Sequence, residues 1–333
     1  MASDKDRDAS ETPTQASPLR EMAKQVMSAF VIPPNEDQLF EPITRAIAAI
    51  PEPFRDAAKN LRANLTGLLS VASMPYTLSQ RSSVNSNWQR IHMASRIRSL
   101  NLDALPGESE EALETRRNAE ALDRAKPEMD KFVSSTQGRE AVIRNTLEIL
   151  EGLRSDESLA EAANELILQS TVLCWGAFEV LARDCFTTHL NLNPSRTLVL
   201  LADPVAKRRF ELTKISIETL GDYGFDLSTR MGTLLADQQD LSDVYSVKAV
   251  YHALFPNDHG LRDAVSDPDL RMLSLRRNLI VHRGGMIDAT YIDSTACSQR
   301  MGEHLRLAPE DLERHVGTTV RTAVSILLAV SAA

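Results

Sequence analysis

The chain has 333 residues, of which 43% are hydrophobic and only 5% aromatic, and its formal net charge is −9. This acidic balance argues against a broadly basic nucleic-acid binder held mainly by phosphate neutralisation, but it is compatible with a local arginine patch in a cleft. Abundant Ala, Leu, Arg and Glu predict an all-α protein, with room for two domains or for one large domain with appendages.

Cysteine and histidine usage predicts neither a disulfide framework nor a metal site. Cys174, Cys185 and Cys297 form no CxxC pair, which indicates reduced thiols in the cytoplasm. The seven histidines show neither an HExxH motif nor a Cys/His ligand spacing, so we expect no metal and no other cofactor. The sequence also has no phosphate-binding loop or dinucleotide fingerprint, which argues against an ATPase or a dehydrogenase.

No membrane association is expected. The N-terminus has no apolar run typical of a signal peptide. The apolar run from Ala323 to Ala333 is too short to span a bilayer.

The first part of the chain is predicted to be a tail followed by helices. Residues 1–18 are rich in Asp, Ser, Thr and Pro and are predicted to be a disordered tail. Apolar side chains then recur at helical spacing in three segments, which are Pro18 to about Val31, Phe40 to Ile50 and Phe54 to Ala72. Met74 to Asn87 is predicted to be a loop, and a basic helical segment follows it.

A domain boundary is expected in the densely charged segment from Glu108 to Lys131, which is typical of an exposed helix or linker. We therefore predict an N-terminal helical region of unknown role over residues 19–125. Residues 126–333 are predicted to form a second helical domain.

The second domain is predicted to contain a long inner helix from Ser158 to about Leu190. The centre of this helix is apolar nearly all round, as expected of the innermost helix of a bundle or of a dimer interface. Glu179 is the exception, and a carboxylate in such surroundings needs a partner. Arg183, one turn later, is the ordinary candidate, whereas Arg276 or Arg277 would make Glu179 part of a site.

Further elements are expected along the rest of the chain. A helix from Pro204 to about Leu220 opens with the basic cluster Lys207-Arg208-Arg209, which is a second candidate for guiding RNA phosphates or simply a solvated helix end. The segment from Asp222 to Asp240 is predicted to be irregular or weakly helical, and Met286 to Ile292 has a strand-like composition consistent with a loop or one hairpin. The remaining segments are a helix from Ser242 to Leu254, a turn from Phe255 to Gly260 and a last helix from Pro309.

The candidate site lies in a helix that should begin at Asp267. Asp267 suits an N-cap and Pro268 suits the first helical position. Gly284 and Gly285 should end the helix, because a left-handed cap has no Cβ penalty at glycine. Arg276, Arg277, Asn278, His282 and Arg283 therefore fall in its last turns.

The spacing of three of these residues suits phosphodiester chemistry. Asn278 and His282 are four residues apart and share one helix face, whereas Arg277 is rotated by about 140° from His282. Only the long arm of Arg277 brings its guanidinium beside the imidazole. A histidine that moves protons, an arginine that binds phosphate and an amide that orients either one can cleave a phosphodiester without metal.

At these positions the sequence resembles the HEPN superfamily, whose signature is an arginine, a polar residue, a short apolar filler and a histidine near a helix C-terminus. Arg277, Asn278, Leu279-Ile280-Val281 and His282 match this order. The resemblance extends over about residues 138–333, where the helix order is compatible with an HEPN-like bundle. The long helix around Glu179 is similar to the first long helix of HEPN domains.

The resemblance implies a metal-independent endoribonuclease that cleaves single-stranded RNA at a composite site in a homodimer. Arg277 and His282 would be the catalytic pair and Asn278 the polar helper. Arg276, Arg283 and Gly284 are candidate RNA-binding residues, with Gly284 admitting the RNA backbone. Many superfamily members serve as toxins, abortive-infection proteins or other antiviral effectors, so an antitoxin or another regulatory protein is a candidate partner.

Two other interpretations are open. One is a non-catalytic HEPN-like module that dimerises or binds RNA or a nucleotide. The other is a helical interaction protein whose Arg/His spacing is accidental. Some HEPN toxins are controlled through a tyrosine two residues after the histidine, and this chain has Gly284 there, so control of that kind is not expected.

Overall fold

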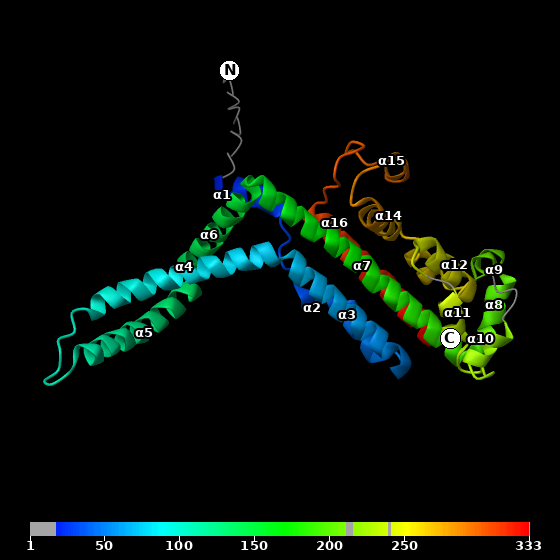
Figure 1. The fold of residues 1–333 in the computed structure, drawn as a ribbon, viewed down its shortest axis with the longest axis horizontal. Coiled ribbons are helices and arrows are strands. Elements are labelled where there is room, and N and C mark those ends of the chain that lie inside the picture. The colour runs from blue at the N-terminus through cyan, green and yellow to red at the C-terminus, as the bar shows by residue number, and fades with distance from the viewer. Residues whose placement is uncertain (1–17, 211–215, 239–240, 333) are drawn as a thin grey trace, which may run out of the picture. The chain divides into compact units, whose positions relative to one another are not determined.

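The computed structural model describes residues 18–210, 216–238 and 241–332, and the regular secondary structure in these ranges is helical (Figure 1). The predicted all-α class is therefore confirmed for this part of the chain. The predicted tail over residues 1–18 lies outside the described residues, except for Pro18 at the start of the first helix.

The helices are, in chain order, α1 (Pro18–Met27), α2 (Glu36–Ala49), α3 (Glu52–Ala72), α4 (Met74–Ser99), α5 (Glu110–Ser134), α6 (Thr136–Ser155), α7 (Glu157–Leu192), the 3-10 helix η1 (Pro194–Arg196), α8 (Thr197–Ala202), α9 (Pro204–Phe210), α10 (Ile217–Asp222), α11 (Met231–Gln238), α12 (Val244–Leu254), α13 (His259–Ala264), α14 (Pro268–Arg283), α15 (Ala289–Thr295) and α16 (Pro309–Ala332).

The chain divides into two compact units. Unit 1 contains residues 1–28 and 78–155, and unit 2 contains residues 29–77 and 156–333. This division differs from the predicted boundary, which separated residues 19–125 from residues 126–333. The reason is that α2 and α3 pack in unit 2, where α3 lies against α7 and α2 lies against α16. Such pairings between distant segments leave no local signal in the sequence.

Helix α7 is the centre of unit 2, with α3, α11, α14 and α16 packed around it (Figure 1). It begins at Asp156, whose carboxylate accepts a hydrogen bond from the Leu159 N–H at 3.1 Å. Trp175, Phe178 and Phe186 are fully buried on it. The predicted inner helix is therefore confirmed.

Helices α7 and α16 are also long and apolar enough to cross a membrane, by length and composition alone. Buried residues make up 56% of the apolar window in α7 and 61% of that in α16. This is weak evidence for a membrane span, because core helices meet the same criterion.

Unit 1 contains helices α4, α5 and α6. An ion pair joins Arg98 to Glu128 at 2.8 Å between α4 and α5, and α6 packs against α1 and α5. The loop predicted from Met74 to Asn87 is wrong, because α4 covers that range. Its buried positions carry small polar side chains, whereas large apolar ones such as Met93 are exposed, so apolar periodicity gives no signal there. These buried residues are Ser79, Ser83, Asn87, Ser95 and Ser99.

Three other segments can be compared with their predictions. The segment from Asp222 to Asp240, predicted to be irregular or weakly helical, contains the eight-residue helix α11. The strand-like piece after α14 forms one antiparallel bridge, between Met286 and His304, and then enters α15. The helix predicted from Pro204 to Leu220 appears as α9 and α10, and residues 211–215 between them lie outside the described residues.

Candidate functional site

Helix α14 begins and ends where the sequence predicts. The Asp267 carboxylate accepts a hydrogen bond from the Asp269 N–H at 2.8 Å, and Pro268 occupies the first helical position. Gly284 caps the C-terminus in the left-handed conformation, with φ 58° and ψ 31°. The Gly285 N–H then donates to the Leu279 carbonyl at 3.2 Å. These caps fix which side chains occupy the last two turns.

The last turns of α14 have a buried face and a solvent face. Leu279 and Ile280 are buried in the core of unit 2. Arg277 and Asn278 are half-buried, and His282 is exposed. The motif residues therefore lie at a surface that a large substrate can reach, while the apolar filler between them anchors the helix.

The guanidinium of Arg277 is directed toward Asn278, the next residue of the motif. Its Nη1 atom donates a hydrogen bond to Asn278 Oδ1 at 3.0 Å. Asn278 and His282 are four residues apart and so are neighbours on the helix surface. The bond to Asn278 thus draws the arginine arm around the helix in the direction that the sequence requires for a joint Arg/His site.

Arg276 has a different environment, although it is the next residue along the chain. Its side chain is 13% exposed, and its Nη1 atom lies 3.0 Å from Asp311 Oδ1 and 2.8 Å from His315 Nε2. Both partners belong to α16. Arg276 therefore ties α14 to α16, and its guanidinium is engaged inside the protein instead of facing RNA as the sequence suggested.

His315 is the acceptor in this contact. Burial lowers its pKa to about 3, with a further contribution from the Arg276 charge. The imidazole is therefore neutral at physiological pH, and its Nε2 atom accepts a hydrogen bond from the Arg276 guanidinium. Neither His315 nor Asp311 was predicted from the sequence to contact Arg276. The sequence signal for such a contact is their i, i+4 spacing on α16, which places two hydrogen-bond acceptors on one helix face.

Arg283 and Gly284 lie at the open end of α14. The Arg283 side chain is 66% exposed, and its Nε atom lies 3.4 Å from Asp288 Oδ2. Such an exposed pair contributes little to stability, so it leaves Arg283 accessible to a ligand. A Cβ at Gly284 would meet no atom within 4 Å, so the surface above this glycine is open.

Glu179 is half-buried on α7 and makes an interaction within the protein. Arg183, its ordinary candidate partner, donates to the Ala236 carbonyl at 3.1 Å and lies 3.8 Å from Asp237. Of the other two candidates, Arg276 is engaged by Asp311 and His315, and Arg277 donates to Asn278. A role of Glu179 in catalysis stays a prediction.

The second basic cluster, which begins at Lys207, lies on α9. Lys207 and Arg208 are exposed, and the side chain of Arg209 lies outside the described residues. Their exposure fits either interpretation of the cluster.

Among the described residues, no group of three or more His, Cys, Asp or Glu side chains is arranged to hold a metal ion. Cys174, Cys185 and Cys297 are free thiols. Burial raises the pKa of Cys174 to about 12, which makes this thiol unreactive.

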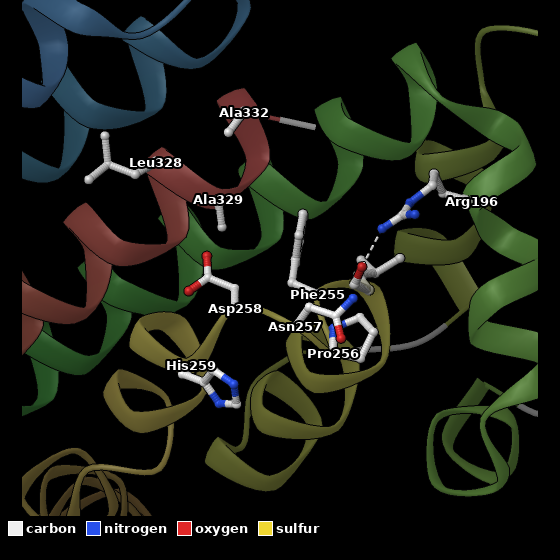
Figure 2. Close-up of a pocket in the computed structure, with 10 residues that line it drawn as sticks. Arg196, Phe255, Pro256, Asn257, Asp258, His259, Leu328, Ala329 and Ala332 are labelled. Atoms are coloured by element: carbon white, nitrogen blue, oxygen red, sulfur yellow. Dashed lines mark hydrogen bonds between the residues drawn. The ribbon is translucent and has the colours of Figure 1, made fainter.

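A pocket of about 690 Å³ lies at the C-terminal end of α16 and is lined by none of the motif residues (Figure 2). Arg196 at its edge donates to the Leu254 carbonyl and lies over the Phe255 ring, 5.9 Å from the centroid. Phe255 is only 8% exposed, so little of its ring is available to a ligand. We assign the candidate site to the end of α14 and not to this pocket.

No protein-family model, curated protein or solved structure matches the chain. The resemblance to the HEPN superfamily therefore stays a prediction that depends on the α14 motif.

Proposed function

We propose that the protein is a metal-independent endoribonuclease of the HEPN type, with an HEPN-like helical bundle in unit 2. The hydrogen bond from Arg277 to Asn278 carries this proposal, because it directs a phosphate-binding guanidinium toward Asn278, the neighbour of the exposed His282 on the helix surface. Leu279 and Ile280 of the apolar filler are buried, so they anchor the helix that presents these groups, whereas Val281 is exposed. A rigid support of this kind is what a preorganised site requires.

The proposed reaction is an in-line transfer within single-stranded RNA. His282 takes the proton from a ribose 2′-hydroxyl, and the 2′-oxygen forms a bond to phosphorus while the bond to the 5′-oxygen breaks. The leaving oxygen takes a proton from the partner subunit's His282 in a homodimer. The products are a 2′,3′-cyclic phosphate and a 5′-hydroxyl. No metal is needed in this scheme, because imidazole is suited to moving protons near neutral pH.

The arginines have separate tasks in this scheme. Arg277 binds the phosphate and stabilises the charge that develops on its non-bridging oxygens. Arg283 contacts the RNA backbone nearby, and Gly284 leaves room for that backbone to approach. Because the whole chain carries a net charge of −9, RNA is recognised by these local cations and not by a broad positive field. The biological setting we propose is a toxin or an antiviral-defence effector in the cytoplasm, restrained by an antitoxin or another regulatory protein.

The test is incubation of the purified protein with total RNA in EDTA, followed by end-group analysis. The parent should leave cyclic-phosphate ends, and His282→Ala should be inactive while keeping the oligomeric state and helicity of the parent. His259→Ala, which removes an exposed histidine outside the motif, is the matched control and should retain full activity. Equal cleavage by the parent and His282→Ala would exclude His282 as the catalytic group.

A non-catalytic RNA-binding or dimerisation module is the second candidate. One observation favours it, since the exposed imidazole of His282 makes no hydrogen bond to another described residue that would set the tautomer of a catalytic base. If the folded parent protein binds RNA but does not cleave it, this candidate is supported.

A further inference from the structure

The segment from Glu303 to Leu307 lies directly beside the turn that ends α14. The Leu305 N–H donates to the Gly285 carbonyl at 2.8 Å, and the Ile287 N–H donates to the Glu303 carbonyl at 3.0 Å. Its side chains alternate. Leu305 and Leu307 are buried, whereas His304 and Arg306, each one residue before a buried leucine, are exposed.

Two side-chain amides hold this segment, one from α7 and one from the chain just before the segment. Asn164 of α7 donates to the Leu305 carbonyl at 3.0 Å and accepts from the Leu307 N–H at 3.2 Å. Gln299 donates to the Arg306 carbonyl at 2.8 Å and accepts from its N–H at 2.9 Å. These four bonds satisfy consecutive backbone groups, so the direction in which His304 and Arg306 project is fixed.

A groove of about 480 Å³ lies between this segment and the first turns of α7. His304 and Arg306 form one wall, Glu161 and Glu165 come from α7, and Asn164 lies among them. The size falls within the range of small-molecule sites. The groove therefore combines an arginine and a histidine with two carboxylates.

The groove is close to the candidate catalytic residues. A Cβ at Gly285 would lie 2.9 Å from His304 Nε2, so the imidazole lies against the turn and only glycine leaves room for it. His282 precedes Gly285 by three residues, which limits the distance between their Cα atoms to about 11 Å. A nucleotide in the groove would thus neighbour the phosphate that His282 is proposed to act on.

The carboxylates remain able to accept hydrogen bonds from a ligand. Glu161 lies 4.0 Å from Arg306, and both side chains are more than 60% exposed, so this pair contributes little and can separate. Glu165 accepts a bond from Gln169 through Oε1 at 2.6 Å, which leaves Oε2 for another donor.

We propose that this groove binds a guanine nucleotide of the RNA substrate. Guanine presents two adjacent donors, N1–H and the 2-amino group, on its Watson–Crick edge, and these match a carboxylate acceptor, whereas uracil offers a single donor there. Arg306 and His304 bind the phosphate of the same nucleotide. Binding of guanine in the groove can be tested with free nucleotides, but the role of the groove as a substrate subsite rests on the proposed ribonuclease activity.

The test is titration of the full chain with GMP, IMP and UMP up to about 10 mM, since a single nucleotide held at a surface groove should bind in the millimolar range. IMP lacks only the 2-amino group. Binding is followed by saturation-transfer NMR for the parent, for Glu165→Gln, for Glu161→Gln and for Glu157→Gln. Glu157 is an exposed glutamate in the first turn of the same helix and does not line the groove, which makes it the matched control.

GMP should bind the parent and Glu157→Gln about tenfold more tightly than IMP or UMP, because a hydrogen bond to a charged group is lost with the other bases. Glu165→Gln or Glu161→Gln should remove this preference. Equal binding of the three nucleotides, or a GMP preference that both groove variants retain, would overturn the proposal, as would an absence of GMP binding. If GMP binds as expected but RNA is not cleaved, the groove assignment stands and the ribonuclease proposal fails.

Discussion

The buried contact between Arg276 and His315 makes the stability of the protein depend on pH. His315 has a pKa of about 3 in the folded protein, against 6.5 for an ordinary histidine. The unfolded chain therefore binds a proton at His315 before the folded protein does. Above pH 6.5 the imidazole is neutral in both the folded and the unfolded state, so His315 adds no pH dependence to the free energy of unfolding. As the pH falls from 6.5 toward 3, the free energy of unfolding decreases, because only the unfolded state gains the proton.

The magnitude follows from the shift. Each pH unit below 6.5 removes about 1.4 kcal/mol, so at pH 5 the loss at His315 is about 2 kcal/mol. His315→Gln is the perturbation, because glutamine does not titrate and its side-chain oxygen replaces Nε2 as the acceptor for Arg276. The variant should therefore lose less stability than the parent between pH 7.5 and pH 5.

The assay is urea unfolding followed by circular dichroism at pH 7.5, 6 and 5 for both proteins. His189 and His252 also have pKa values lowered by burial, but they are present in both proteins and cancel in the comparison. If the two free energies of unfolding change in parallel with pH, His315 is not the buried neutral acceptor described here.

Two further predictions concern packing and the adjacent arginines. Gly232→Ala should destabilise the fold by about 1–3 kcal/mol in urea unfolding, because the new Cβ would lie 2.1 Å from the Thr187 carbonyl oxygen of α7. Gly176→Ala, whose Cβ meets no atom within 4 Å, should be neutral or stabilising. Arg276→Lys should lower the free energy of unfolding by about 1–3 kcal/mol, because one ammonium replaces a guanidinium that contacts two acceptors. Arg277→Lys should leave that free energy unchanged and reduce kcat for RNA cleavage by about a hundredfold; equal kcat for parent and variant would contradict the proposed arginine role.

The elements that sequence analysis predicted well are those with local signals. Helix α14 is capped by Asp267 at its N-terminus and by Gly284 at its C-terminus, and both caps depend only on residues close to them in the sequence. Helix α7 is apolar over most of its circumference, so its central place required no knowledge of its neighbours. The order of the motif residues is also local, and their helical spacing set the face on which Asn278 and His282 lie.

The elements that it missed depend on partners far along the chain. Helix α4 buries small polar residues, and the Ser83 hydroxyl donates to the Val142 carbonyl at 3.0 Å, so its inner face looks like a solvent face in the sequence. Asn164 likewise bonds to Leu305 and Leu307, more than a hundred residues along the chain, so no short-range pattern connects them. Local periodicity reports which residues share a face but not what covers that face.

The contrast between Arg276 and Arg277 shows what this limit means for the site. The two residues are identical in type and adjacent in sequence, but a step of about 100° around the helix turns one toward α16 and the other toward solvent. Asp311 offsets the charge of Arg276, so this arginine adds little to the attraction of RNA. Its position beside Arg277 nevertheless matters, because a tie between α14 and α16 fixes the rotation of the helix. The same tie that turns Arg276 away from the proposed RNA-binding surface therefore holds the helix that carries Arg277, Asn278 and His282.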